Sequence, residues 1–413
     1  MKKVLFLSIF FLISVFIGYE NPHLIEVPKK HIKFTLKSLK LIDNFVIEKD
    51  EIETTDNEKF NTLDSEKLIV EGNSFNLVLE KKINFDDRTA GFFIEQSEKG
   101  ITEFDIYLQN GVNINNTNTK EIFLPKDIYF EQNGGVKTIF KVKEKKFVLA
   151  SNKKNNCAYA TIYEIEIQKI ILETKCIPDN KNVDFNGLGG AVVKEDDFIY
   201  ISIGAPEWDS KEISSLAQRK DYFYGKIIKT KKENFINYLD KPINFDIFTY
   251  GHKNPQGLII DQETFFSIEH GPQGGDEINL INENKNYGWP DVSYGTEYNN
   301  GESYKKNDEK YEKPLFTFLP SIAPSSLERC PKNLKKYYTD EICLIFLTLR
   351  DMSLYVVLID KLKLNVISYE KFKIGERLRH FGKKDNQLYE KDSMFFISAD
   401  GEGVFSAKFD NFR

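Results

Sequence analysis

Histidine, cysteine and sustained helical periodicity are all scarce in this chain of 413 residues. It has five histidines and four cysteines, and no two cysteines form the CxxC pattern of a zinc site. Lysine and glutamate are interspersed, the net charge is −6, and there is no basic patch of the kind that binds nucleic acid. Residues 212–219 are the best candidate for a helix, and that helix would be short. The sequence therefore argues against zinc, against a nucleic-acid partner and against a mainly helical fold.

The composition is that of a folded, strand-rich protein. Hydrophobic residues make up 41% of the chain and charged residues 29%, which excludes disorder as a description of the whole. Aromatic residues reach 14%, and aromatic side chains favour strands. Short runs rich in Val, Ile, Phe and Tyr, separated by Gly, Asn, Asp and Lys, predict strands at 68–70, 75–79, 91–94, 104–108, 138–142, 147–150, 159–167 and 170–173.

An internal repeat narrows the choice among all-β folds. Residues 190–205 (GAVVKEDDFIYISIGA) align without gaps on residues 257–272 (GLIIDQETFFSIEHGP), each as two apolar strands around a polar turn. A looser copy with a longer turn covers 380–401, and a weaker copy covers 136–151. Strand pairs that recur in this way are typical of propeller blades, and four to six blades fit after about residue 60. A long β-sandwich with coincidental hairpins is the alternative.

The N-terminus predicts export. Met1-Lys2-Lys3 precedes an almost unbroken apolar run, residues 4–19, as in a secretory signal peptide or an uncleaved anchor. The run is short for a membrane span, and no Ala-x-Ala site follows it. We expect a periplasmic or extracellular protein, with possible membrane anchoring through this run. The expected segments are a leader at 1–20, a Lys-rich lead-in at 21–60 and a single propeller domain at 61–413.

The four cysteines fit an oxidising compartment. Cys157 and Cys176 bracket one hairpin-sized segment, and Cys330 and Cys343 bracket another. Disulfides within these two pairs are plausible, but spacing alone does not fix connectivity, and buried free thiols are the alternative.

The stretch from Gly251 to Gly295 concentrates polar residues around two apolar strands. His252 to Gln256 precede the strand at 258–260, and Glu269 to Glu277 follow the strand at 265–268. In an antiparallel hairpin the start of one strand lies beside the end of the next. Both polar clusters should therefore meet at one rim of the sheet, where a site would be built.

The same stretch resembles the soluble PQQ-dependent sugar dehydrogenases, also called the glucose/sorbosone dehydrogenase family. Its segments GHKNPQGL, EHGPQGGDEINLI and NYGWPDVSYG match recurring family elements in order and spacing. Further likenesses are the segments 132–135 (QNGG), 225–227 (GKI), 320–325 (PSIAPS) and 375–379 (GERLR). The resemblance covers about residues 125–410. It implies a six-bladed β-propeller of four-stranded antiparallel blades, with the quinone cofactor in a groove on top.

The resemblance also implies which residues would hold the cofactor and calcium. PQQ carries three carboxylates and an ortho-quinone, so its site needs cations, amide donors and a metal. Arg377 and Arg379 alternate on one strand and would clamp carboxylates. Asn254 and Gln256 match the family's amide contacts. The carbonyls of Gly271 and Pro272 match its Ca²⁺ ligands, since carbonyl oxygens suit a hard cation; Glu277 and Tyr287 match a second calcium region of some relatives.

Each of these residues also has a simpler interpretation. Arginines that alternate on a strand are usually solvated, and amides near turns usually satisfy their own loops. Asp276 and Glu277 could belong to a solvated acidic loop, and His252 and His270 could be hydrogen-bonded structural residues. Only their joint occurrence inside the long motif favours a site.

Three departures from the family pattern bear on catalysis. The family's base histidine, in an HFGGR-like segment, falls on Gly187 here, and its arginine falls on Ala191; Asp184 is the nearest carboxylate that could replace the base. Loss of such a base typically costs about 10²–10⁴-fold in rate. Lys253 stands where the motif has arginine, which keeps the charge but loses the planar fork. Arg350 stands where the family has a lysine that contacts PQQ.

The sequence therefore predicts a PQQ- and Ca²⁺-dependent oxidoreductase that oxidises an aldose or related alcohol by hydride transfer. Lys253 would help to hold charge at the reacting centre, Asp184 is the candidate base, and the electron acceptor is unidentified. Catalysis could be altered or weakened because the histidine is missing. The alternative is a non-catalytic propeller that binds carbohydrate or another envelope component. A hydrolase would need a carboxylate pair or a metal-histidine cluster, and neither is found.

Overall fold

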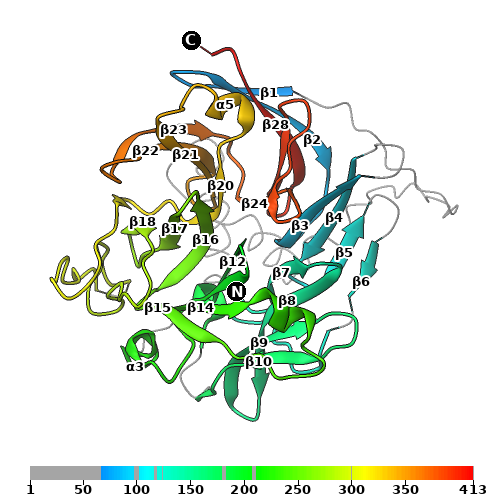
Figure 1. Ribbon diagram of the computed structural model, residues 1–413, viewed down its shortest axis with the longest axis vertical. Coiled ribbons are helices and arrows are strands. Elements are labelled where there is room, and N and C mark those ends of the chain that lie inside the picture. Colours follow the sequence, from blue (N-terminus) through cyan, green and yellow to red (C-terminus); the bar gives the residue numbers. More distant parts are fainter. Residues whose placement is uncertain are drawn as a thin grey trace, which may run out of the picture. The chain divides into compact units, whose positions relative to one another are not determined.

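The computed structural model describes residues 67–96, 102–115, 119–122, 124–178, 183–206, 211–298 and 300–412. Their strands form six sheets, antiparallel but for one short parallel pairing, arranged around a common centre (Figure 1). This is a six-bladed β-propeller, so the predicted fold is confirmed. The predicted leader and lead-in at 1–60, with the apolar run at 4–19, lie outside the described residues.

The first three blades follow one another along the chain, and in each the first strand is the innermost (Figure 1). Blade 1 comprises β3 (Thr89–Gln96), β4 (Thr102–Leu108), β5 (Val112–Asn115) and β6 (Thr119–Glu121). Blade 2 comprises β7 (Val136–Val142), β8 (Lys145–Lys154), β9 (Cys157–Glu164) and β10 (Ile170–Glu173), with β11 (Ile177–Pro178) beside β9. Blade 3 comprises β12 (Gly189–Glu195), β13 (Phe198–Ile203), β14 (Lys226–Lys231) and β15 (Asp246–Tyr250).

The last three blades complete the ring. Blade 4 comprises β16 (Asn254–Asp261), β17 (Thr264–His270), β18 (Asp276–Leu280) and β19 (Phe316–Phe318). Blade 5 comprises β20 (Pro324–Arg329), β21 (Glu341–Thr348), β22 (Ser353–Asp360) and β23 (Val366–Lys373). Blade 6 comprises β24 (Leu378–Phe381), β27 (Phe395–Ala399), β28 (Gly403–Asp410), β2 (Asn76–Ile83) and β1 (Lys67–Glu71).

The helices of the described residues are short and lie between strands. They are η2 (Phe185–Gly187), α3 (Lys211–Ser214), η3 (Ser215–Gln218), α4 (Lys232–Ile236) and α5 (Lys332–Lys335). The helix predicted at 212–219 corresponds to α3 and η3 together. Among the described residues no helix has the length and apolar character that crossing a membrane requires.

Each sequence repeat is the inner hairpin of a blade. The two copies that align without gaps are β12–β13 and β16–β17, and the weaker copy is β7–β8. The looser copy is β24 and β27, and its longer turn contains the small hairpin β25 (Lys383–Lys384) and β26 (Gln387–Leu388). The pattern was detectable because both inner strands are buried between neighbouring blades and must be apolar.

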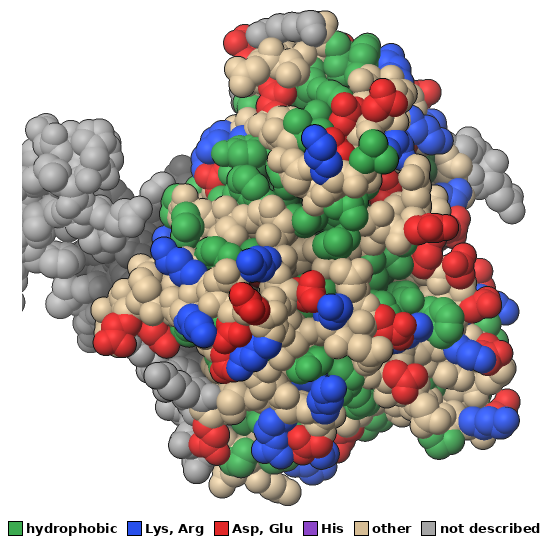
Figure 2. Space-filling model, turned by 60° about the vertical axis from the view of Figure 1, so that its left-hand side comes forward, with side chains coloured by type: hydrophobic (Ala, Val, Ile, Leu, Met, Phe, Trp, Pro, Cys, Tyr) green, Lys and Arg blue, Asp and Glu red, His purple; other side chains and the backbone are tan. Residues whose placement is uncertain are grey.

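The core consists of apolar layers between adjacent blades. β21 reads ICLIFL after Glu341 and is buried along its whole length after that residue, because other blades cover both of its faces. The outer strand β23 instead exposes five of its eight residues. On the face shown in Figure 2, basic, acidic and apolar side chains are interspersed.

Both predicted cysteine pairs are disulfides in the structure. Cys157 joins Cys176 across 5.3 Å between their Cα atoms, and Cys330 joins Cys343 across 5.4 Å. The first closes the outer part of blade 2, and the second ties the end of the β20 segment to β21.

Candidate functional site

The inner strands begin at one rim of the propeller, and hydrogen bonds join the starts of neighbouring blades there. Asn133, just before β7, donates from Nδ2 to Asp184, just before β12, at 3.0 Å. The amide of Gly189, at the start of β12, donates to Asn254 Oδ1, at the start of β16, at 3.0 Å. We call this the entry rim. Asn254 also lies opposite His270 in the β16–β17 pairing, as the hairpin argument predicted.

Asn254, Gln256 and His270 form one hydrogen-bonded unit on the entry rim. Asn254 Oδ1 accepts from Gly189 and from Gln256 Nε2 at 2.7 Å, so its Nδ2 donates to His270 Nδ1 at 3.1 Å. His270 then carries its proton on Nε2 and donates it to the carbonyl of Pro324 at 2.7 Å. Asn254 is 1% exposed. The two predicted amides thus lie together, with Asn254 bound into the frame and Gln256 lining the central cavity.

Four cations gather on the entry rim around two carboxylates, and we call this set the cationic rim. Arg379 donates from Nε and an NH₂ group to Asp400 at 2.5–2.9 Å. Arg377 is an exposed residue, and its NH₁ group donates to the carbonyl of Leu349 at 3.4 Å. Burial and the charge of Arg379 lower the pKa of Arg377, with Asp400 opposing. The members of the cationic rim are Arg88, Lys137, Arg377 and Arg379, and its carboxylates are Asp184 and Asp400.

An excess of positive charge held by the fold suits a polyanionic ligand. Arg88 precedes β3, Lys137 lies in β7, and Arg379 lies in β24, so three adjacent blades contribute. Like charges brought together in this way destabilise the empty site, and an anion would relieve their repulsion. Arg377 and Arg379, predicted to act together, are brought together, although Arg379 is already paired with Asp400.

Asp184 has a clear structural role. It is buried and caps η2, because its Oδ1 accepts from the amide of Asn186 at 2.7 Å. Both carboxylate oxygens also accept from Asn133 Nδ2, at 3.2 and 3.0 Å. The structure therefore places Asp184 on the entry rim, with its oxygens occupied by amide donors.

Lys253 lies under an aromatic surface beside the entry rim. It is 4% exposed, and its Nζ lies 5.5 Å from the centre of the Trp289 ring, a cation–π distance. Its backbone amide donates to Glu269 at 3.0 Å, and its carbonyl accepts from Ala205 at 2.7 Å. The adjacent Gly204 cannot be replaced without displacing backbone, since a Cβ there would lie 1.9 Å from the carbonyl of Gly187.

Arg350 is the second residue after β21, and its side chain is exposed. Its backbone amide is held by the carbonyl of Ile322 at 3.1 Å. Arg350 therefore has a fixed backbone and a guanidinium that is open to solvent.

The predicted calcium carbonyls lie in a loop that Asp276 organises. The Asp276 carboxylate accepts from the amide of Gly271 at 2.9 Å and from Ser321 Oγ at 3.1 Å. It also accepts from the amides of Ile322 and Ala323, both at 2.7 Å. A single carboxylate thus binds the loop after β17 to the loop before β20. Asp276 fixes the turn that contains the carbonyls of Gly271 and Pro272.

Glu277 and Tyr287, the second predicted calcium region, line one small cavity. Burial raises the pKa of Glu277, and the negative charge of Glu269 raises it further. The Tyr287 hydroxyl donates to the carbonyl of Leu280 at 2.6 Å and accepts from the amide of Asn282 at 2.9 Å. Among the described residues there is no group of three or more His, Cys, Asp or Glu suited to a metal ion. The calcium prediction therefore depends on carbonyl oxygens and one carboxylate.

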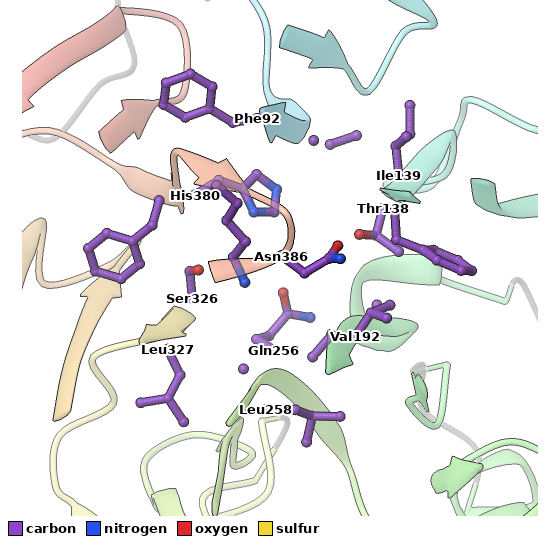
Figure 3. Close-up of a pocket in the computed structure, with 18 of the residues that line it drawn as sticks. Phe92, Thr138, Ile139, Val192, Gln256, Leu258, Ser326, Leu327, His380 and Asn386 are labelled. Carbon is purple, nitrogen blue, oxygen red and sulfur yellow. The ribbon is translucent and has the colours of Figure 1, made fainter. Parts of the chain in front are cut away.

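A narrow cavity lies at the propeller centre. Its volume is about 70 Å³, which admits several water molecules but not a tricyclic cofactor. Gln256, Ser326, His380 and Asn386 gather around it (Figure 3). A larger ligand would therefore have to bind outside this cavity, where the cationic rim lies.

A β-propeller with a cationic, amide-bearing entry rim is the class of protein that this structure defines. The family model for glucose/sorbosone dehydrogenases matches residues 129–401, more than half of the chain, so the protein belongs to that family. The predicted family membership is confirmed.

Characterised relatives and solved structures agree with this assignment. The aldose sugar dehydrogenase of Escherichia coli is 30% identical over 154 residues, which is 34% of this chain and 40% of that protein. Quinoprotein glucose dehydrogenase B of Acinetobacter calcoaceticus is 39% identical over 80 residues, 18% of this chain and 17% of that protein. The chain thus spans well under half the length of these curated relatives.

Similarity of fold extends further. The apo-form of the E. coli aldose sugar dehydrogenase matches with a TM-score of 0.65 at 18% identity, covering 80% of this chain and 99% of that one. The PQQ-bound aldose sugar dehydrogenase of Streptomyces coelicolor matches with a TM-score of 0.56 at 14% identity, covering 82% and 99%. Because both identities are below 25%, these structures support the fold of this chain and nothing beyond it.

Sequence reasoning missed Arg88, Lys137 and Asp400. Lys137 is the second residue after the QNGG segment at 132–135, and that segment was the available signal. It shares its strand face with Lys141, however, and two lysines four apart on a strand are normally interpreted as solvated. Arg88 and Asp400 lie far from each other in sequence, and only closure of the ring brings them to one rim.

Proposed function

We propose that this protein is a PQQ- and Ca²⁺-dependent dehydrogenase that oxidises an aldose or a related alcohol. Family membership supports the proposal, and the cationic rim is the observation that carries it. Three arginines, joined by Lys137 when it is protonated, face two carboxylates there, so the rim has an excess of positive charge that suits a tricarboxylate. When bound, PQQ supplies an ortho-quinone that takes up a hydride.

The residues of this chain would bind and orient that group. Arg377, Arg379 and the exposed Arg350 would pair with its carboxylates, and Gln256 would contribute an amide contact through Oε1, since its Nε2 already donates to Asn254 and Gly189. Lys253, packed under Trp289, would contribute a fixed positive charge near the reacting centre. Asn254 would act by holding Gln256 in place, since the two side chains are hydrogen-bonded.

Calcium would bind to the loop that Asp276 fixes. The carbonyls of Gly271 and Pro272 would be its ligands, with Glu277 and Tyr287 forming the second region. Export and a periplasmic or extracellular site of action belong to the same proposal, as do a small sugar or alcohol substrate and a separate electron acceptor. They are supported by the charge-then-apolar N-terminus and by the relatives' names.

The second candidate is a non-catalytic propeller that binds carbohydrate on the same rim. One observation favours it, namely that none of the described histidines is placed as an open base. His252 is buried between Thr249 and Glu269, and His270 is bound between Asn254 and Pro324. His380 is buried beside the central cavity.

Titration of the metal-stripped protein with PQQ, followed by absorbance with and without Ca²⁺, separates the two candidates. We expect saturable binding that Ca²⁺ strengthens, and then turnover of an artificial dye acceptor with a panel of aldoses. The variant Arg377→Gln should weaken binding about tenfold or more, since a charge-assisted hydrogen bond contributes about 1.5–3 kcal/mol. Absence of binding at high micromolar PQQ would exclude the dehydrogenase and favour the binding propeller.

A further inference from the structure

The structure provides a second amine on the entry rim besides Lys253. Lys137 is the second residue of β7, and its side chain is half-buried. Its Nζ donates to the backbone carbonyl of Asn133, a residue in a left-handed conformation with φ of 55°. Asn133 in turn donates from its amide to Asp184. Lys137 and Asp184 therefore lie on either side of one fixed asparagine, at the starts of adjacent blades.

The surroundings of Lys137 disfavour its ammonium form. Burial lowers its pKa to about 7, and the positive charges of Arg379 and Arg88 act in the same direction, while Asp184 opposes them. Within the described residues Lys137 makes no ion pair within 4.0 Å. A lysine held in this way has a substantial fraction of neutral amine at neutral pH, which is the condition for an efficient general base.

Another buried lysine shows what a purely structural role looks like. Lys226 in β14 is fully buried, and its Nζ donates to three carbonyls, those of Leu216, Ala217 and Tyr224, at 2.6–3.0 Å. All three of its N–H donors are used. Lys137 has one described acceptor, the carbonyl of Asn133, and otherwise faces the charged groups of the entry rim.

We propose that Lys137 is the proton acceptor of the dehydrogenase reaction, in place of the histidine that the chain lacks. The carbon–hydrogen bond of the substrate breaks with its electron pair, and the hydride passes to the ortho-quinone oxidant. The hydroxyl proton passes to the lone pair of Lys137 Nζ, and the carbon–oxygen bond becomes a carbonyl. The resulting ammonium is stabilised by Asp184 and by the carbonyl of Asn133.

Asp184 is less suited to this step although it is the nearer residue in sequence to the missing base. Its oxygens already accept from Asn133 and from Asn186, and it caps η2. These amide donors occupy the carboxylate oxygens that would otherwise have to accept the substrate proton. We assign Asp184 to positioning Asn133 and to balancing the charge of protonated Lys137.

This inference rests on the proposed function, and a pair of substitutions tests it. Lys137→Arg keeps the positive charge but removes a titratable base, since arginine does not lose its proton in proteins. Lys137→Gln removes both the positive charge and the titratable base. Lys141→Arg and Lys141→Gln, on the same strand but paired with Glu95, are the matched controls.

If Lys137 is the base, Lys137→Arg still binds PQQ, because the positive charge of the rim is kept, while kcat falls by about 10²–10⁴-fold. The Lys141 variants keep the PQQ binding and the kcat of wild type. In the wild type kcat/KM rises with pH as Lys137 loses its proton; bound carboxylates raise its pKa, so the rise falls at or above about pH 7 in the holoenzyme. The rise of kcat/KM with pH should disappear in Lys137→Arg. A small primary amine added to the solution should partly restore turnover to Lys137→Ala.

A measurement without the cofactor gives an independent readout. Competitive acetylation of the apo protein at a series of pH values, read by mass spectrometry, reports the pKa of the Lys137 amine. We expect half-reaction near pH 7, against 10.5 for an ordinary lysine. Half-reaction near pH 10.5, or a wild-type kcat in Lys137→Arg, would overturn the assignment of Lys137 as the proton acceptor. Lys137 would then contribute only a positive charge to the rim. Failure of the wild type to bind PQQ would instead refute the proposed function, and the acceptor role with it.

Discussion

At the scale of single residues, the buried imidazole of His380 makes stability depend on pH. His380 lies in β24 beside the central cavity, and its Nε2 has no hydrogen-bond partner among the described residues. Burial and the positive charges of Arg379 and Lys383 together lower its pKa to about 3, against the opposing charge of Asp400. The folded protein therefore keeps this ring neutral, whereas the unfolded chain protonates it below about pH 6.5.

The sign of the effect follows from proton uptake. Between about pH 6.5 and pH 3 the unfolded state binds one more proton at His380 than the folded state does, so stability falls as pH falls. The slope from this one group is about 1.4 kcal/mol per pH unit inside that window. In His380→Gln this contribution is absent. Urea unfolding at pH 4, 5, 6 and 7 should show the variant losing less stability than wild type on acidification.

Lys384→Gln is the matched control, since Lys384 is exposed on the neighbouring short hairpin. It should retain the pH dependence of wild type. Parallel curves for wild type and His380→Gln would show that the ring is protonated in the folded protein, contrary to this account.

Contacts between residues of one contiguous motif could be predicted from the sequence, and contacts that depend on ring closure could not. Asn254 and Gln256 were expected together because they are two apart on a strand, and they are hydrogen-bonded. Lys137 gave no such signal, because its environment is set by Arg379 and Arg88, which come from opposite ends of the chain. Burial of a lysine on an apparently solvated strand face is a tertiary effect.

At the scale of elements, the junction between blades 4 and 5 depends on one carboxylate. Asp276 accepts four hydrogen bonds, from Gly271, Ser321, Ile322 and Ala323, and three of the donors are backbone amides. In Asp276→Asn, either orientation of the amide places an N–H₂ group against backbone donors. We expect a loss of about 2–4 kcal/mol in unfolding free energy, since unmade buried hydrogen bonds cost about 1–3 kcal/mol each. Urea denaturation measures it.

On the proposed calcium role, the same substitution should also weaken Ca²⁺ binding, because it releases the turn that contains the carbonyls of Gly271 and Pro272. Calorimetric titration with Ca²⁺ reads this directly. Asp246→Asn, at an exposed position of β15, should change neither quantity. Unchanged stability and unchanged Ca²⁺ affinity in Asp276→Asn would show that the two loops are held by other contacts.

Inner hairpins were predictable and outer strands less so, for a physical reason. β12–β13 and β16–β17 are buried on both sides and repeat a dense apolar pattern. The outer strand β19 has three residues and follows a long loop after β18, so it is too short to show the alternation that identifies a strand. Two inner hairpins, β3–β4 and β20–β21, also escaped the repeat search because their turns and sequences diverge from the other copies.

At the scale of the whole molecule, blade 6 closes the ring by joining the two ends of the propeller. β24, β27 and β28 come from the C-terminal part, and β2 and β1 come from the start of the described chain. β2 pairs with β28 from Asn76 opposite Asp410 to Ile83 opposite Val404. No local pattern could reveal this pairing, because its partners are separated by almost the entire sequence.

Phe75, immediately before β2, is the apolar contact at which that closure can be tested. It is 1% exposed, and its ring lies 5.3 Å from Phe372 of blade 5 and 5.1 Å from Phe409 of β28. Phe75→Ala should cost about 3–5 kcal/mol, the usual range for truncating a buried phenylalanine. Because the β2–β28 pairing joins the two ends of the propeller, we expect the midpoint of the whole unfolding transition to fall.

Thermal unfolding followed by circular dichroism, with limited proteolysis at 25 °C, distinguishes global from local effects. Phe130→Ala is the control, since Phe130 is 47% exposed and its truncation should change stability by less than about 1 kcal/mol. A lowered midpoint with one cooperative transition would show that the seam stabilises all six blades together. Early proteolytic release of β1 and β2 without a change in the main transition would show instead that the remaining blades hold the ring without them. Whether β2 stays paired with β28 also bears on the cationic rim. Arg88 lies in the segment that joins β2 to blade 1, whereas Arg379 lies in β24, on the other side of the β2–β28 pairing.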